Sequence, residues 1–504
     1  MFQLGNHQKQ FLIDTRTEDV VPLLKKLIER NTLLIGHNIK YDYSVIKTNY
    51  GLEIENVFDT MLACQLLAYN QKESSLIKKK KLSFSLEACV QRYYDKYAYS
   101  PQGALFYPAV TKKIRESFAK ITDGAFSEAQ QWYALFDVFT CYALFLKTAP
   151  KLEEHDLKDA IYQENEFLKV AADCEINGVP LDTDLWLDAS AEAKVKLEEL
   201  GKSLAAIADI NWASPKQVNE VFKSLGVDTS ILDKKTGEIK ESVGRVHLEK
   251  QIARFPQLQP YIEYGKARKT VSSYGEKFLR HLNPTDGRIH TSLLQLKDTG
   301  RTGSTDPNMQ NIPHGDAYRR AFVAPQGHTF VVADFSNQEM RLLAHYSGDK
   351  NLNEAFATGV DIHTATARIM YNNPDLGKES EERRYAKSVN FLIGYGGGAK
   401  KLSENFGIPM VQAKKVFQTY NTQFSGLQPY FIKGGQEARE VGYVLINDVS
   451  KRRGPIESYE TYKWLEAQIN RYKRNGWDVH PKYSDLYSYL DSKLQRTSQN
   501  YRIN

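Results

Sequence analysis

The sequence lacks the marks of several protein classes. Its four cysteines, Cys64, Cys89, Cys141 and Cys174, form no Cys-x-x-Cys pair, which argues against a zinc knuckle or a dithiol redox site. No apolar run reaches membrane-spanning length, and the first residues carry no hydrophobic signal-peptide segment. We therefore expect reduced thiols in a cytoplasmic protein, or one of the host cytoplasm if a phage encodes it.

The length of 504 residues is too great for one core and predicts roughly three domains. The apolar content is ordinary for a globular protein, so there is material for several cores. A formal net charge of +6 is compatible with nucleic-acid binding but does not demonstrate it.

Residues 1 to about 150 have the pattern of an α/β domain. Leu33 to Gly36 is a short apolar strand candidate, and Thr17 to Arg30 has helical spacing with Pro22 in the first turn. The lysine run from Lys78 to Lys81 is typical of a solvated loop, with a DNA contact as the less favoured interpretation.

The predicted secondary structure changes near residue 151 and again near residue 321. Residues 151 to about 320 are mainly helical, and 234–245 and 264–280 mix basic, small and aromatic residues. That mix suits a phosphate-backbone contact and an ordinary charged helix pair equally well. Residues 328–336 predict a buried strand, and helical patterns follow it. The segment 457–490 is dense in Tyr, Trp, Lys and Asp.

Asp334 ends the predicted strand, and a carboxylate held by a rigid sheet is a good ligand for a divalent metal. The backbone carbonyl of Phe335 could be a further ligand. The alternative is a turn residue or a helix N-cap.

Four residues at a spacing of four share one broad helical face, because each step drifts by only about 40°. Arg383 and Lys387 give that face two cations suited to a triphosphate, and Phe391 and Tyr395 add flat surfaces for a sugar and a base. The alternative is a pair of basic side chains lying along a stripe of core aromatics.

Two segments, DFSNQEMR (334–341) and RRYAKSVNFLIGYG (383–396), resemble family A DNA polymerases, the bacterial DNA polymerase I type, in a phage-like form. The resemblance implies a catalytic role for Asp334 and Lys387. It implies that Glu339 blocks the sugar 2′ position and excludes ribonucleotides. Phe391, where some members have Tyr, implies discrimination against dideoxynucleotides.

The resemblance extends to two flanking segments. Residues 361–367 are similar to the segment whose histidine, here His363, contacts the nucleotide phosphates, although a lone histidine on a helix is more often structural. Residues 299–313 are similar to the primer-template loop. That similarity implies minor-groove contacts by Arg301, Gln310 and Asn311.

The front of the chain resembles the 3′–5′ exonuclease that precedes family A polymerases. Three patterns carry this resemblance in the family's order: Gly36 to Asp42, Phe58 to Leu67 and Tyr133 to Asp137. Tyr133 and Asp137 share a helical face, where a phenol can orient a water beside a metal-bound carboxylate. The resemblance implies Asp42 and Asp137 as metal ligands, supported by Asn38 and Tyr133.

The family's first exonuclease motif, an Asp-x-Glu pair, does not precede the segment 10–15. The exonuclease site would then lack two carboxylates, and we expect little or no 3′–5′ degradation. The family's His-Asp-Glu palm motif is also absent, so the second carboxylate of a two-metal Mg²⁺ site is missing.

The expected fold is α/β plus α: an RNase H-like exonuclease-type domain followed by a right-hand polymerase with a thumb, a partial palm and fingers. We expect the exonuclease-like domain in 1–150, the thumb and the start of the palm in 151–320, the palm strand in 321–348, and the fingers with an incomplete return to the palm in 349–504. The expected partners are primer-template DNA, deoxynucleoside triphosphates and a second polypeptide with the rest of the palm. We expect no membrane partner.

The function expected from this resemblance is template-directed DNA synthesis in replication, by a truncated or split chain that needs a C-terminal part for activity. The alternative is a catalytically inactive module that binds primer-template DNA.

Overall fold

The computed structural model describes residues 1–6, 8–70, 83–94, 108–121, 124–232, 238–252, 254–297, 300–313, 315–446, 451–456 and 458–503. The predicted lysine loop at 78–81 lies outside these ranges. None of the helices in them combines the length and the apolar composition needed to cross a bilayer.

The amino-terminal lobe is mixed α/β, as expected. Its helices cover a parallel pair of strands, β3 and β4, whose register joins Leu34 to Val57 and Gly36 to Asp59. The carboxyl ends of these two strands therefore lie side by side. The elements of this lobe are β1 Phe2–Gly5, β2 Gln10–Ile13, α1 Val21–Glu29, β3 Leu34–Gly36, α2 Ile39–Tyr50, β4 Val57–Asp59, α3 Thr60–Asn70, α4 Leu86–Tyr93, α5 Pro108–Phe118 and α6 Glu128–Glu154.

The helix expected over 17–30 begins later, at Val21, with Pro22 in its first turn as predicted. Proline suits that position because its missing N–H has no helical partner there. The helix buries Leu24 in the lobe's core.

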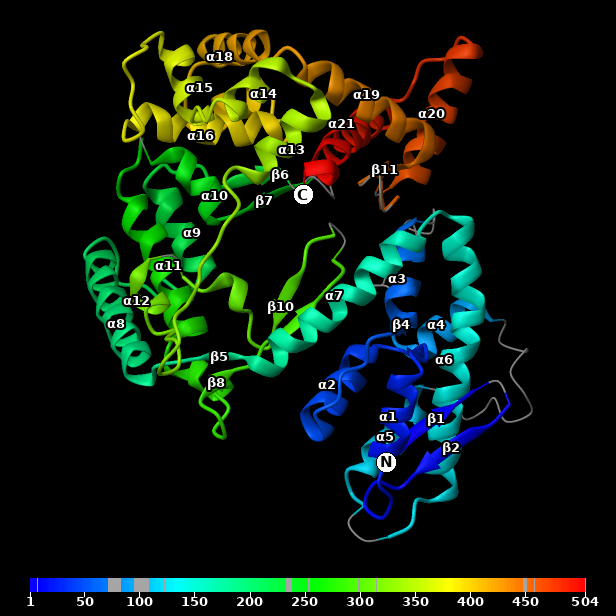
Figure 1. Ribbon diagram of the computed structural model, residues 1–504. Coiled ribbons are helices and arrows are strands. Elements are labelled where there is room, and N and C mark those ends of the chain that lie inside the picture. The colour runs from blue at the N-terminus through cyan, green and yellow to red at the C-terminus, as the bar shows by residue number, and fades with distance from the viewer. Residues whose placement is uncertain are drawn as a thin grey trace.

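A long helix, α7 Lys158–Asn177, runs from this lobe to a second group of helices, shown in green in Figure 1. The core of that group surrounds Trp186, which is fully buried and stacks on Phe278 with ring centroids 4.5 Å apart. The elements are β5 Val179–Pro180, α8 Thr183–Ala205, α9 Pro215–Ser224, β6 Ser230–Leu232, β7 Ile239–Glu241, α10 Arg245–Leu248, α11 Leu258–Tyr274, β8 Arg288–Ile289, β9 Ser292–Leu294, β10 Gly303–Thr305 and α12 Asp316–Arg319. Short 3₁₀ turns lie at Glu249–Gln251, Glu276–His281 and Met309–Asn311.

The third group is almost wholly helical and lies across the top of Figure 1. Leu343, Val389, Leu402 and Leu427 are fully buried in its main core. The elements are α13 Gln338–Ser347, α14 Lys350–Ala357, α15 Ile362–Tyr371, α16 Glu381–Gly394, α17 Ala399–Phe406, α18 Met410–Gln423, α19 Leu427–Val441, β11 Tyr443–Leu445, β12 Arg453–Pro455, α20 Tyr459–Arg474 and α21 Pro481–Ile503.

The prediction of a buried strand over 328–336 is wrong. The segment lies outside every strand of the described chain, and Val331 and Val332 are 88% and 92% exposed. Phe330 and Phe335 are also exposed. β-Branched residues favour a strand only where a neighbour takes up the backbone hydrogen bonds, and no described strand pairs with this segment.

Candidate functional site

Helix α16 carries the predicted row of cations and aromatics. Its first turn is capped by Ser380, whose hydroxyl accepts a hydrogen bond from the Arg383 backbone N–H at 3.2 Å. Arg383, Lys387 and Phe391 lie on the helix, and Tyr395 stands at its C-cap. The fully buried side chains on the other face of the helix are Ala386, Val389, Asn390 and Ile393. Arg383, Lys387 and Phe391 therefore lie off the buried face of α16, whereas Tyr395 packs partly against the core.

A pocket of about 360 Å³ lies beside this row. Four cationic side chains line it, against one carboxylate, that of Asp361. Such an excess of positive charge in a concave surface favours an anionic ligand. The lining residues are Ser336, Asn337, Arg341, Phe356, Gly359, Val360, Asp361, His363, Lys378, Arg383 and Lys387.

Asp361 joins α15 to α16. Its carboxylate caps α15 by accepting hydrogen bonds from the Thr364 backbone N–H and hydroxyl, at 3.2 and 2.6 Å. The same carboxylate accepts from Arg383 Nε at 2.5 Å and Nη2 at 3.2 Å. Burial alone would raise the pKa of Asp361, but the hydrogen bonds from Arg383 and Thr364 outweigh it and hold the pKa well below its usual value. Arg383 is therefore already partly neutralised.

His363 is only 2% exposed and bonds through both ring nitrogens. Asn390 Nδ2 donates to His363 Nδ1 at 2.8 Å, and His363 Nε2 lies 3.1 Å from Asn337 Oδ1. Burial lowers the pKa of His363 to about 4, so the ring is neutral at pH 7. Because Nδ1 accepts, Nε2 carries the proton and donates to Asn337. The His363 ring would donate to a phosphate only if its hydrogen bond to Asn337 were broken.

Arg301, Glu339 and Tyr395 meet although the sequence separates them widely. Arg301 Nη2 lies 2.9 Å from Glu339 Oε1 and 3.5 Å from the Tyr395 hydroxyl. Burial, with the adjacent Glu339 carboxylate, raises the pKa of Tyr395 to about 12. One predicted DNA contact, the residue predicted to exclude a 2′ hydroxyl and one predicted base contact thus form a cluster between the loop before β10, α13 and α16.

Phe391 and Tyr395 also line a second pocket of about 670 Å³. The Phe391 ring lies 5.8 Å from the ring of His363. Helix α16 therefore borders a basic pocket through its cations and a more apolar one through its aromatics.

Asp334 and Phe335 lie in the exposed segment before α13 rather than at a strand end. Asn337, not Asp334, occupies the N-cap position of α13, so the capping alternative does not apply. The described residues contain no group of three or more His, Cys, Asp or Glu that could hold a metal ion. They do not by themselves fit a two-metal site.

Gln310 and Asn311 form an exposed 3₁₀ turn after β10. The Gln310 side-chain amide donates to the Thr302 carbonyl at 3.4 Å. Both side chains are open to a ligand, and Thr299 of the same predicted motif lies outside the described residues.

The exonuclease-like residues gather at the carboxyl ends of β3 and β4. Asn38 has a left-handed backbone (φ 58°) and occupies the N-cap position of α2, which carries Asp42 one turn later. The pKa of Asp42 is raised to about 6, chiefly because the surrounding protein withdraws the carboxyl from water, and further by the charge of Asp59. Part of the Asp42 residue is nevertheless exposed, although neighbouring groups crowd its carboxyl.

Asp59 is a residue that the sequence reasoning missed. It is 1% exposed, and its carboxylate accepts four backbone N–H bonds, from Asn38, Ile39, Met61 and Leu62, at 2.7–3.3 Å. Burial nevertheless raises its pKa to about 6. Asp59 thus holds the turn that presents Asn38 and Asp42. Its place in the pattern Phe58 to Leu67 is the signal that could have indicated this.

Tyr133 and Asp137 lie one turn apart on α6, as predicted. Burial, together with the charge of Glu87, raises the pKa of Asp137 to about 7, against the opposing effect of a hydrogen bond from Tyr133. Burial and the Asp137 charge raise the pKa of the Tyr133 phenol.

Models of two known protein families match this chain and show the class of protein to which it belongs. The model of the 3′–5′ exonuclease family matches residues 1–153, and that of DNA polymerase family A matches residues 184–475. The chain belongs to DNA polymerase family A. The expected order of an exonuclease domain followed by a polymerase domain is confirmed.

Several relatives are bacterial DNA polymerases I. That of Borreliella burgdorferi is 30% identical over 458 residues, which is 89% of this chain and 47% of the relative. The thermostable enzyme of Thermus filiformis is 35% identical over 339 residues, 65% of this chain and 40% of the relative. The chain thus spans about half the length, or less, of the curated relatives it matches.

The fold is also that of a solved structure, the polymerase domain of Pol1 from M. smegmatis in complex with DNA primer-template and dNTP. The TM-score is 0.75 at 23% sequence identity, over 98% of this chain and 77% of the other. At that identity the likeness concerns the fold alone.

Proposed function

We propose that the chain carries out template-directed DNA synthesis by adding deoxynucleotides to a primer 3′ end, in DNA replication. The observation that carries the proposal is the basic pocket along α16, with the Arg301–Glu339–Tyr395 cluster beside it. A triphosphate matches the positive charge of the basic pocket. The Arg301–Glu339–Tyr395 cluster offers ionic and aromatic groups for a sugar and a base.

Each predicted residue takes a role in this proposal. Lys387 and Arg383 hold the triphosphate, and Lys387 neutralises the charge that develops at the reacting phosphate. His363 orders the pocket through Asn337 and Asn390. The remaining roles follow the family resemblance. Phe391 and Tyr395 contact the sugar and base, Glu339 excludes a 2′ hydroxyl, Arg301, Gln310 and Asn311 contact the primer-template, and Asp334 with the Phe335 carbonyl binds Mg²⁺.

We further propose that the second metal-binding carboxylate comes from residues outside this sequence, on a longer chain or a second polypeptide. Two observations support this. The described residues hold no metal-binding cluster around Asp334, and the apolar segment with Val331 and Val332 is exposed without a paired strand. An added hairpin could cover these side chains and pair with their backbone.

The proposed division places the exonuclease-like domain in 1–150, the thumb and the start of the palm in 151–320, the palm segment with Asp334 in 321–348, and the fingers in 349–504. In the first of these, the exonuclease-like site is proposed to be nearly inactive, because the Asp-x-Glu pair of the family is not found before residues 10–15 and the described residues hold no group of three or more metal-binding side chains. Robust single-strand degradation that Asp137→Ala abolishes would contradict this.

Primer extension tests the main proposal. A labelled primer on a longer template is incubated with Mg²⁺ and the four deoxynucleoside triphosphates, with and without an added polypeptide that carries a His-Asp-Glu hairpin. We expect extension only with the addition, and none with Lys387→Ala. Extension by the unmodified chain alone would contradict the need for a second carboxylate.

The same experiment tests the alternative of a catalytically inactive module that binds primer-template DNA. A gel shift of the primer-template without extension, even after the addition, would support the alternative.

A further inference from the structure

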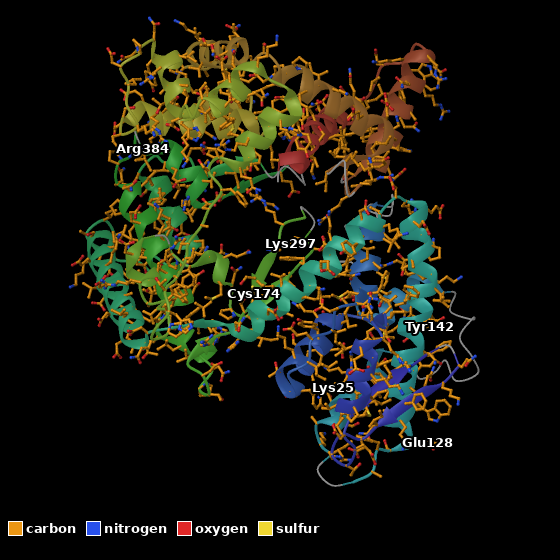
Figure 2. All side chains as sticks on the ribbon, viewed as in Figure 1. Lys25, Glu128, Tyr142, Cys174, Lys297 and Arg384 are labelled. Atoms are coloured by element: carbon orange, nitrogen blue, oxygen red, sulfur yellow. The ribbon has the colours of Figure 1, made fainter. Side chains whose placement is uncertain are left out.

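Helices α20 and α21 meet at a corner that the proposed polymerase site does not use. The corner lies at the end of the helical layer away from α16, on which Arg384 is labelled in Figure 2. It is built by the part of the chain, 459–483, whose high content of Tyr, Trp and Lys is evident in the sequence. Its inner face is fixed by Tyr462 and Leu465, which are buried against α21.

Four aromatic rings form a continuous ladder across the outer face of this corner. The Trp464 and Tyr483 centroids are 5.8 Å apart, those of Tyr483 and Tyr472 are 6.4 Å apart, and those of Tyr472 and Trp477 are 5.8 Å apart. The three pairs cross at 79–84°. The two tryptophans at its ends are 51% and 55% exposed, so each keeps indole surface in water. A contiguous row of aromatic rings with two exposed indoles, unlike a single exposed side chain, is typical of an interaction surface.

Exposed cations flank the rings of the ladder along the sequence. Arg471, Lys473, Arg474 and Lys482 are all exposed, against one acidic residue, Asp478, in the segment 470–483. Within the described chain, none of these four cations forms an ion pair with a carboxylate. The one ion pair of α20 is Lys463 with Glu466. Cations without a carboxylate partner, next to exposed rings, match a polyanion with flat bases.

We propose that this corner, defined as Trp464, Tyr472, Trp477 and Tyr483 with the cations of 471–482, binds single-stranded DNA. The bases stack on the indoles and the backbone phosphates lie along the cations. Stacking on rings carries no base code, so binding is independent of sequence. The corner is separate from the pocket at α16, and its binding of single-stranded DNA is measured without DNA synthesis. A failure of this proposal is therefore distinguishable from a failure of the proposed polymerase function.

The first test is fluorescence anisotropy of a fluorescein-labelled dT20 oligonucleotide with the full chain, at several NaCl concentrations. We expect Trp464→Ala/Trp477→Ala to weaken binding at least about 10-fold at 0.1 M NaCl. We expect Arg471→Gln/Lys473→Gln/Arg474→Gln to lower the slope of log affinity against log salt by about 2, since each phosphate contact on a single strand contributes about 0.7. The triple variant changes only exposed side chains, which keeps the test valid if the tryptophan variant folds poorly.

Matched controls come from the amino-terminal lobe. Lys25→Gln/Lys26→Gln/Arg30→Gln removes three exposed cations on and next to α1, where Lys25 is labelled in Figure 2, and Trp132→Ala removes an exposed tryptophan on α6. Both are expected to bind dT20 within about twofold of the unmodified chain. Equal losses in controls and corner variants would overturn the proposal.

Photo-crosslinking gives an independent readout. An oligonucleotide with 5-iododeoxyuridine is irradiated on the unmodified chain and the crosslinked peptides are mapped. Crosslinks within 459–483 are expected, and their confinement to other segments would overturn the proposal. If the corner variants alter sedimentation of the chain but leave dT20 binding unchanged, the surface is a protein contact and the proposal fails.

Discussion

Replacing Asp361 with asparagine is expected to weaken the fold and at the same time to strengthen anion binding. The asparagine keeps an oxygen that can cap α15, but it loses the charge that holds Arg383 at 2.5 Å. The pair is partly buried, with side-chain exposures of 27% and 12%. Charge-assisted hydrogen bonds in such a setting contribute about 1–2 kcal/mol, which lowers Tm by about 2–8 °C.

The gain in binding has the same cause. Without the carboxylate, Arg383 offers its full charge to the basic pocket, worth about 1 kcal/mol at a few ångströms in a solvated site. This corresponds to an affinity about fivefold higher. Calorimetric titration with inorganic tripolyphosphate measures the change without any assumption about catalysis.

The stability effect has a definite pH dependence. The pKa of Asp361 is depressed in the folded chain, so its contribution is fully present above the ordinary aspartate pKa of about 4 and is lost as the pH falls through the folded value. The difference between the variant and the unmodified chain is therefore largest at neutral pH and shrinks in acid.

Asp349→Asn is the matched control. Asp349 caps α14 by accepting from the Leu352 N–H and also accepts from the Gly426 N–H, but it has no ion pair in the described chain. Equal loss of stability in both variants, with no gain in tripolyphosphate affinity for Asp361→Asn, would refute the reasoning.

Three further predictions concern the same region. Lys387→Ala, an exposed change, is expected to weaken tripolyphosphate binding about 10-fold while Tm moves by less than about 2 °C, measured by titration and thermal unfolding. Glu339→Gln is expected to lower the pKa of Tyr395 from about 12 toward its ordinary value, because the neighbouring charge is lost; tyrosine ring NMR with a Tyr395→Phe assignment control measures this. Val331→Ser/Val332→Ser is expected to leave stability within about 0.5 kcal/mol of the unmodified chain, whereas Leu343→Ala, at a fully buried site, is expected to cost about 2–5 kcal/mol in denaturant unfolding.

Local rules explain why α16 could be predicted from the sequence. Its cations and aromatics repeat every four residues, and its cap is a serine just before the first turn. The same is true of Pro22 in α1 and of Tyr133 and Asp137 on α6, since helical spacing alone places them.

Features that depend on distant partners could not be predicted in this way. The segment around Val331 has strand composition, but a strand forms only against a neighbour, and residue type says nothing about that neighbour. Asp59 and the contact of Arg301 with Glu339 depend on tertiary approach across 20 to 40 residues of sequence.

The pairing of Asp361 with Arg383 also decides how the basic pocket can work. A pocket whose cations were all unpaired would bind a triphosphate tightly and release pyrophosphate slowly, since both are polyanions. In this chain the Asp361 carboxylate partly neutralises Arg383. Lys387, on the next turn of α16, has no carboxylate partner among the described residues. Lys387 thus supplies attraction at all times, and Arg383 supplies it only when a ligand competes with Asp361. For the proposed triphosphate ligand, this difference between Lys387 and Arg383 favours exchange over tight retention.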